Sequence, residues 1–73
     1  MIEGIVQSFD ERRGDGTLRD DHGATFYFHC VEIADGTRTI EVGQRVRARR
    51  AAGHRGEDQA VGVTRVESGS STR

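Results

Sequence analysis

The stretch Arg13-Gly14-Asp15-Gly16-Thr17-Leu18, followed by Phe26-Tyr27-Phe28-His29, decides how this chain is expected to fold. Side chains alternate in character along both stretches, which is typical of strands with one buried face. The segment between them contains Asp20-Asp21-His22-Gly23, a sequence that favours a tight hairpin. The pattern therefore predicts two paired strands, over residues 15–19 and 25–30.

The two strands should present a polar surface with aromatic character. Successive side chains of a strand point to opposite faces, so burying the two phenylalanines leaves Tyr27 and His29 in water. On the neighbouring strand, Asp15 and Thr17 would lie beside them. An exposed Tyr-His pair suits flat ligands with polar edges, such as nucleic-acid bases. The alternative is a cross-strand pair that only stabilises the sheet.

The rest of the chain divides into further short apolar segments separated by glycines and polar clusters. Strands are expected over residues 4–9, 44–50 and 59–66, with a glycine-rich loop over residues 51–58. In the long connection after residue 30, Ile33 and Ile40 should be buried. We find no ten-residue stretch with capped helical periodicity. The prediction is an all-β domain over residues 1–66, followed by a flexible tail over residues 67–73.

Length and composition limit the kind of protein. Seventy-three residues, 33% of them hydrophobic, allow one domain with a thin core. The one cysteine, Cys30, excludes an internal disulfide framework. The first residues lack the pattern of a signal peptide, and no apolar run is long enough for a bilayer. A soluble cytoplasmic protein is expected.

The charges are unevenly distributed, although the net charge is only −1. Residues 1–43 contain four arginines against nine acids, and residues 44–73 contain seven arginines against three acids. From Gln44 to Gly56 there are five arginines and no acid: Arg45, Arg47, Arg49, Arg50 and Arg55. This predicts a basic face on a weakly acidic body, which either contacts phosphates or is simply solvated.

Metal binding and catalysis find no support in the pattern. Cys30 directly follows His29, so their side chains diverge, and His22 and His54 stand alone. Asp20-Asp21 is most simply part of a turn, and no nucleophile or phosphate-loop motif occurs. We expect no metal, no cofactor and no enzymatic activity.

Five segments in order carry a resemblance to a known family: Glu3-Gly4-Ile5-Val6-Gln7-Ser8-Phe9-Asp10, Arg12-Arg13-Gly14-x-Gly16-x-Leu18, Phe26-Tyr27-Phe28-His29, Gly36-Thr37-Arg38-Thr39-Ile40-Glu41-Val42-Gly43-Gln44-Arg45-Val46, and Gly53-His54-Arg55-Gly56 with Gln59-Ala60. The second and third resemble the paired ribonucleoprotein motifs of the bacterial cold-shock domain family, and the fourth resembles its Gly-x-Lys-x-Leu-x-x-Gly-Gln-x-Val. The resemblance covers about residues 3–66. It implies a five-stranded antiparallel OB-fold barrel that binds single-stranded RNA or DNA.

The resemblance also implies roles for individual residues. Phe9, Tyr27 and His29 would stack on bases, and Arg13, Arg38 and Arg55 would hold phosphates or bracket bases. Asp15 and Thr17 lie at motif positions on the same surface. The implied function is an RNA chaperone or regulator of gene expression, with no membrane partner and no small-molecule cofactor.

Several positions depart from the family pattern. Exposed aromatic residues usually stand where this chain has Ser8, Asp15, Thr17 and Cys30, and often where it has Thr37. Each lost stack removes about 1–3 kcal/mol per base, so weaker and more salt-sensitive binding is expected. Asp15 would add a negative charge beside the bound strand.

Local alternatives stay open for single residues. Phe9 could belong to the rim of the core, Arg12 and Arg13 could pair with Asp10 and Glu11, and Arg55 could be a solvated loop charge. For the whole protein, the rival hypothesis is a protein-interaction or self-associating module, with a homodimer as its simplest form, on a fold that has lost nucleic-acid binding.

Overall fold

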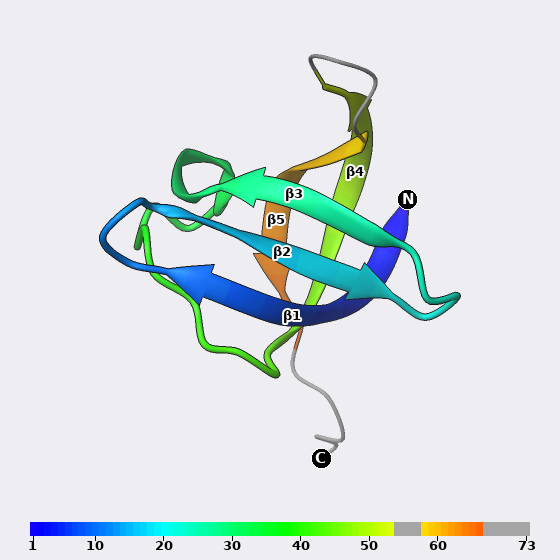
Figure 1. Ribbon diagram of the computed structural model, residues 1–73, viewed down its shortest axis with the longest axis horizontal. Coiled ribbons are helices and arrows are strands. Elements are labelled where there is room, and N and C mark those ends of the chain that lie inside the picture. Colours follow the sequence, from blue (N-terminus) through cyan, green and yellow to red (C-terminus); the bar gives the residue numbers. More distant parts are fainter. Residues whose placement is uncertain (54–57, 67–73) are drawn as a thin grey trace.

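The computed structural model describes residues 1–53 and 58–66. Five strands form a closed barrel in the order β1-β2-β3-β5-β4 (Figure 1). The strands are β1 (Ile2–Asp10), β2 (Asp15–Asp20), β3 (Thr25–His29), β4 (Arg45–Ala52) and β5 (Asp58–Arg65), and a single 3-10 turn, η1 (Cys30–Glu32), follows β3. The predicted all-β, five-stranded barrel is confirmed.

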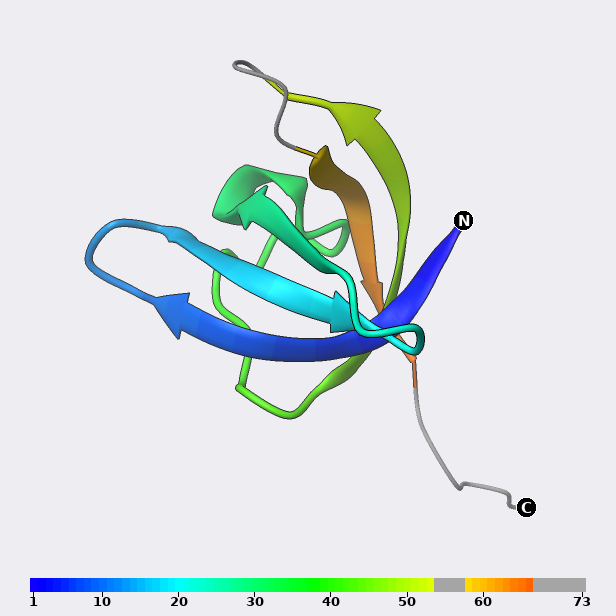
Figure 2. The same ribbon diagram turned by 45° about the vertical axis from the view of Figure 1, so that its right-hand side comes forward.

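Four of the five neighbouring pairs of strands are antiparallel, and one is parallel. β1 pairs with β2 and with β4, β2 with β3, and β4 with β5, all antiparallel. β3 and β5 run parallel and meet through the register pair Tyr27–Gln59. The parallel pair closes the barrel and is the one contact between neighbouring strands that departs from the predicted antiparallel pattern. Seen from the second direction, β4 and β5 run together on one side of the barrel, where β4 adjoins β1 and β5 adjoins β3 (Figure 2).

The core fills the inside of the barrel with aliphatic and phenylalanine side chains. Val6, Leu18, Phe28, Val46 and Val63 are almost completely buried. Ile33 and Ile40 are also buried, at 2% and 6% exposure, as the sequence predicts for the long connection. Removing this apolar surface from water, at about 25 cal/mol per Å², is the main stabilising contribution.

The element boundaries differ from the sequence prediction by one or two residues at most ends, and two of the differences change the description. Cys30 begins the 3-10 turn instead of ending β3, and His29 caps that turn. Ala51 and Ala52 continue β4 by pairing with Gln59 and Asp58, so the expected loop over 51–58 is shorter. The predicted tail, 67–73, lies outside the described residues. No helix among residues 1–53 and 58–66 is long and apolar enough to cross a membrane.

One arginine fastens the long connection between η1 and β4. The Arg65 guanidinium pairs with Asp35 and donates hydrogen bonds to the Thr37 hydroxyl at 3.2 Å and the Thr39 carbonyl at 2.5 Å. Thr37 in turn donates its backbone N–H, at 3.0 Å, and its hydroxyl, at 2.8 Å, to the Asp35 carboxylate. The N–H of Thr37 is the main reason that the pKa of Asp35 lies below its usual value. The connection is therefore tied to the end of β5.

Candidate nucleic-acid interface

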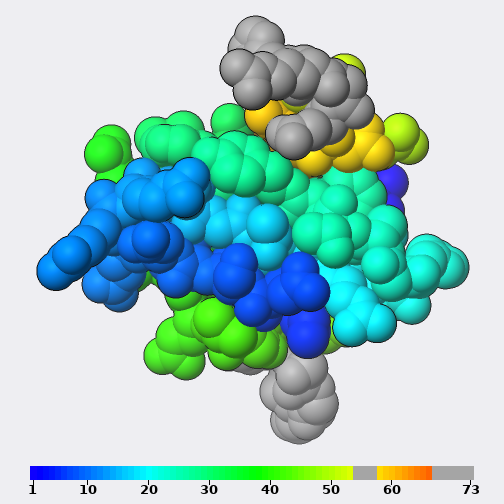
Figure 3. Space-filling view, in the orientation of Figure 1, coloured from blue at the N-terminus to red at the C-terminus, as the bar shows by residue number. Residues whose placement is uncertain are grey.

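The outer surface of β1, β2 and β3, which we call the front face, holds most of the predicted site. These strands form one continuous surface toward the viewer in Figure 3, with the β1–β2 turn projecting at one end. The register places Asp15 opposite His29 and Thr17 opposite Tyr27. The predicted neighbours are thus brought together.

A bulge in β1 decides which of its side chains reach this face. The register with β2 shifts between Val6 and Ser8, so Gln7 and Ser8 are both exposed. The bulge also turns Phe9 back toward the rim of the barrel, where it is only partly exposed. Its ring lies nearly parallel to that of Phe28, with centroids 6.0 Å apart and an interplanar angle of 14°. Phe9 therefore packs against the core and also lines the front face.

Asp15 is the main difference from the sequence prediction. Only 9% of the residue is exposed, so it does not stand in water on the front face. The Tyr27 hydroxyl donates a hydrogen bond of 2.8 Å to its Oδ2, and Nη2 of Arg13 lies 3.2 Å from the same oxygen. The Arg13 side chain itself is 71% exposed. The negative charge of Asp15 is thus covered by a phenol and offset by a guanidinium.

The ion pair of Arg13 also differs from the local alternative. Its side chain pairs with Asp15 and with neither Asp10 nor Glu11 among the described contacts. Asp10 instead accepts the backbone N–H groups of Arg12 and Arg13, at 3.0 and 3.4 Å, and so organises the turn. The turn closes at Gly14, whose φ of 74° suits glycine.

Polar side chains of β1 and β2 meet beside this cluster. The hydroxyl oxygens of Ser8 and Thr17 are 2.9 Å apart, and the Thr17 hydroxyl donates to Gln7 at 3.3 Å. Neither Gln7 nor Ser8 was predicted as a site residue. A two-residue alternation would turn Ser8 inward from Val6, and the sequence contains no signal for the bulge that prevents this.

The exposed His29 lies at the end of β3. Its Nδ1 accepts the backbone N–H of Val31 at 3.4 Å, which caps η1 and leaves the proton of the neutral ring on Nε2. The Sγ atom of Cys30 lies 3.8 Å from the same ring nitrogen. Within the described part of the chain, no group of three or more His, Cys, Asp or Glu side chains is placed to bind a metal ion.

These residues surround an open depression of about 340 Å³, the front depression. Its lining includes two aromatic residues, two residues with hydroxyl groups besides the tyrosine, two acids and one arginine: Ser8, Phe9, Asp10, Arg13, Asp15, Gly16, Thr17 and Tyr27. Aromatic surface for stacking, a cation and several hydrogen-bonding groups thus lie within the space of one or two bases.

One of three comparisons with known proteins found a match, and that match concerns the fold. No protein-family model matches the chain, and no curated protein sequence matches it significantly. Among solved structures, a Drosophila structure described as Unr CSD456, which contains cold-shock domains, matches with a TM-score of 0.76 and 25% sequence identity. The match covers 97% of this chain and 29% of that chain, so this chain spans less than a third of its length. The chain has the fold of a cold-shock domain. Cold-shock domains are in general a family of nucleic-acid-binding domains.

Of the two remaining predicted residues, the structure describes Arg38, which does not line the front depression. Arg38 is exposed in the connection fastened by Arg65 and is the one non-glycine residue with positive φ, 63°, in the described part of the chain. Its neighbour Thr39 lines a surface hollow together with Glu11 of the β1–β2 turn, so this segment borders the turn that carries Arg13. Arg55 lies outside the described residues.

The arginines of β4 are largely paired with carboxylates. The alternation is confirmed, with Val46 and Ala48 buried and the arginines facing outward. However, three of them form ion pairs: Arg45 with Asp21, Arg47 with Glu3 and Arg50 with Asp58. The two hydrogen bonds from Arg45, at 2.7 and 3.2 Å, are the main reason that the pKa of Asp21 is lowered. This surface is therefore less positive than the arginine count suggests.

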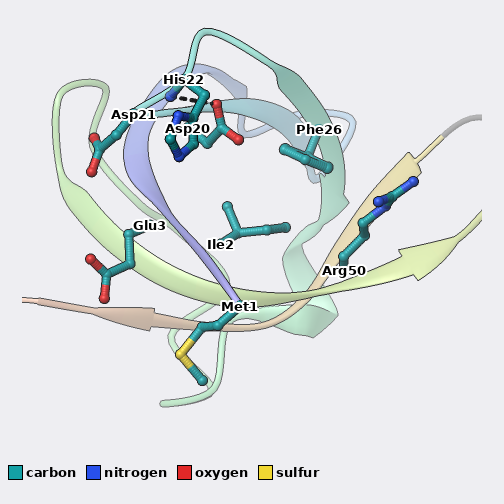
Figure 4. Close-up of a pocket in the computed structure, with 8 residues that line it drawn as sticks. All are labelled: Met1, Ile2, Glu3, Asp20, Asp21, His22, Phe26 and Arg50. Carbon is teal, nitrogen blue, oxygen red and sulfur yellow. Dashed lines mark hydrogen bonds between the residues drawn. The ribbon is translucent and has the colours of Figure 1, made fainter.

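A second depression, of about 420 Å³, lies at the hairpin end of the barrel (Figure 4). Its floor contains the buried Ile2 and Phe26, and its rim contains Asp20 and His22. Asp20 accepts the backbone N–H groups of His22 and Ala24, at 2.9 and 2.8 Å, so it forms the hairpin turn. This depression contains none of the predicted site residues. Asp20 serves the turn, and the other charged residues of the lining, Glu3, Asp21 and Arg50, form ion pairs.

Proposed function

We propose that this protein binds single-stranded RNA or DNA on its front face and acts as an RNA chaperone or regulator of gene expression. The observation that supports this most directly is the front depression, where Phe9, Tyr27 and Arg13 converge on the outer strands of a cold-shock fold. Flat rings can stack on bases of any sequence, and a guanidinium can contact a phosphate or stack in turn. As a chaperone, the protein would capture unpaired bases and thereby melt weak RNA structure.

The expected affinity is modest. Phe9, Tyr27 and His29 are the aromatic rings available on or beside this face, and each stack is worth about 1–3 kcal/mol. A complex with micromolar Kd needs about 8 kcal/mol in total. Three stacks with a few phosphate contacts reach this range, whereas a platform with additional aromatics at Ser8, Asp15, Thr17 and Cys30 would exceed it. We propose weaker binding than a full aromatic platform gives, and no catalytic role.

The test is fluorescence anisotropy of labelled oligonucleotides of about seven to ten bases, since the protein has no tryptophan to report binding. Saturable binding to single strands, and weaker binding to a duplex of the same sequence, is the expected result. No binding at tens of micromolar protein and low salt would refute the proposal.

Variants of one side chain separate stacking from other effects. Tyr27→Ala removes the ring and should weaken binding by roughly 5- to 150-fold, corresponding to about 1–3 kcal/mol. Tyr27→Phe keeps the ring and loses the hydroxyl that donates to Asp15, so it should retain most of the affinity for a mixed sequence. His29→Ala should also weaken binding, and His22→Ala, an exposed histidine of the hairpin, is its matched control. Equal effects of the two histidine variants would contradict a role for the front face.

A second candidate function rests on the seam between β3 and β5. These strands meet through one register pair, so their edges offer a place where a strand of a second molecule could add. The second candidate is a homodimer or a protein-interaction module. Sedimentation distinguishes the two functions: a stable dimer that binds no oligonucleotide would favour this candidate. The proposed compartment is the cytoplasm.

A further inference from the structure

The Asp15 carboxylate has an unusual position for a nucleic-acid-binding surface. Its side chain is 12% exposed, and Asp15 lines the front depression together with Phe9 and Tyr27. Both of its side-chain contacts, from the Tyr27 hydroxyl and the Arg13 guanidinium, go to Oδ2. Its Oδ1 accepts no hydrogen bond from any described side chain. A largely buried carboxylate oxygen with spare acceptor capacity favours a ligand that donates hydrogen bonds.

The four bases differ in what they offer to a carboxylate. The Watson–Crick edge of guanine presents two adjacent donors, N1–H and N2–H, next to the acceptor O6. Cytosine and adenine each present one amino group beside an acceptor nitrogen. Uracil and thymine present one imide N–H between two carbonyl oxygens, and these oxygens repel a carboxylate. Guanine is therefore the base that donates hydrogen bonds to a carboxylate best.

The neighbours of Asp15 complete this match. An N–H donor of guanine can donate to Oδ1 of Asp15, while its O6 can accept a hydrogen bond from Arg13, which lies 3.2 Å from Oδ2 and is otherwise exposed. The rings of Phe9 and Tyr27 border the same depression and can contact the flat face of the base. At this one site, Asp15 and Arg13 can thus hydrogen-bond to the edge of a base while the aromatic rings contact its face.

We propose that Asp15 is a specificity-determining residue, and that the front depression selects guanine over uracil or thymine in a single strand. This inference rests on the proposed function, because it concerns the same surface. It explains why a negative charge can occupy this position without excluding nucleic acid: Arg13 offsets the charge, and the base donates hydrogen bonds to the carboxylate.

The test uses labelled seven-base oligouridines in which the central base is G, C, A or U. The wild-type protein should bind the central-G oligonucleotide about tenfold more tightly than the all-U oligonucleotide, with C and A in between. Asp15→Asn keeps the volume of the side chain and an acceptor for Tyr27, but its amide lacks the second acceptor oxygen and the charge. In this variant the ratio of the G and U affinities should fall to about one. Glu11→Gln removes the same charge from the neighbouring turn and should leave the ratio unchanged.

Three results would overturn the inference, and they are distinguishable. If the wild-type protein binds all four oligonucleotides equally or prefers U, Asp15 does not select guanine, although the proposed function stands. If Asp15→Asn weakens all four by one factor, Asp15 only positions Tyr27 and Arg13. If the folded wild-type protein binds none of the four at low salt, the proposed function itself fails. Circular dichroism of each variant shows that the fold is intact.

Discussion

The close packing of β1 and β2 at Gly16 offers a direct test of how the front face is built. A Cβ added at Gly16 would lie 2.2 Å from the backbone oxygen of Ser8, 2.9 Å from Cα of Phe9 and 3.1 Å from Cδ1 of its ring. Gly16 does not have a positive φ, so alanine fits the local backbone conformation. The substitution Gly16→Ala therefore tests the contact with β1 alone.

Two opposing effects set the size of the change in the free energy of unfolding. Replacing glycine by alanine restricts the unfolded chain, which stabilises a protein by about 0.4–1 kcal/mol where the site allows it. Forcing an extra carbon into a packed site costs about 1–3 kcal/mol. Because the closest atom at Gly16 belongs to the backbone and cannot rotate away, the cost should lie at the upper end. We expect a net destabilisation of about 2 kcal/mol, with Phe9 displaced from the front depression.

Urea unfolding and oligonucleotide anisotropy together provide the assay. With a slope of about 1 kcal/mol per molar urea for so small a domain, the midpoint should fall by about 2 M. Affinity should fall as well, because Phe9 moves. Gly4→Ala is the matched control: its Cβ would lie 2.0 Å from the Arg19 carbonyl oxygen, on the same strand pair but outside the front depression. It should lower the midpoint and leave the affinity of the folded protein unchanged. A Gly16→Ala protein more stable than wild type would refute the packing argument.

Three further outcomes are expected. Leu18→Ala, at a completely buried position, should lower the free energy of unfolding by about 3–5 kcal/mol, and a loss below about 1 kcal/mol in thermal unfolding would contradict the described core. The pKa values of Asp21 and Asp35 lie below the usual 3.8 in the folded state, so the stability they add is present above about pH 4 and is lost as the pH falls through their lowered pKa values. Urea midpoints at about pH 7, 4 and 2.5 should therefore fall less steeply below pH 4 in Asp21→Asn and Asp35→Asn than in wild type, and equal slopes would speak against these contacts. Binding should weaken with salt at a log-log slope of about −2, as about 0.7 per phosphate predicts for three arginine contacts, and a slope beyond about −5 would indicate that the arginines of β4 also contact the strand.

The sequence by itself determined the strands and the inward or outward direction of most side chains. In β3, only one orientation of the strand buries both Phe26 and Phe28, since a shift of the register by one residue would expose both rings. The same reasoning predicted the burial of Ile33 and Ile40 and the outward direction of the β4 arginines. Turn residues between the strands supplied the hairpin. These properties follow from periodicity, which acts over a few residues and can be read along the chain.

The tertiary structure alone decided which charges are neutralised. Arg45 pairs with Asp21, 24 residues away, and Arg47 with Glu3, 44 residues away. Such partners meet only because the barrel closes, which brings β4 beside β1. A basic segment in the sequence therefore became a surface of paired charges.

The candidate site likewise depends partly on the local sequence pattern and partly on how the strands pair in the barrel. Period-two alternation placed Tyr27 and Asp15 on one face, but the bulge in β1 sets the position of Phe9 and exposes Ser8. Tyr27 and Arg13 both contact Asp15. Its carboxylate was expected to be an exposed charge and is instead a largely buried hydrogen-bond acceptor. Burial and hydrogen bonding depend on how neighbouring strands are offset and twisted, and no pattern within one strand specifies that offset.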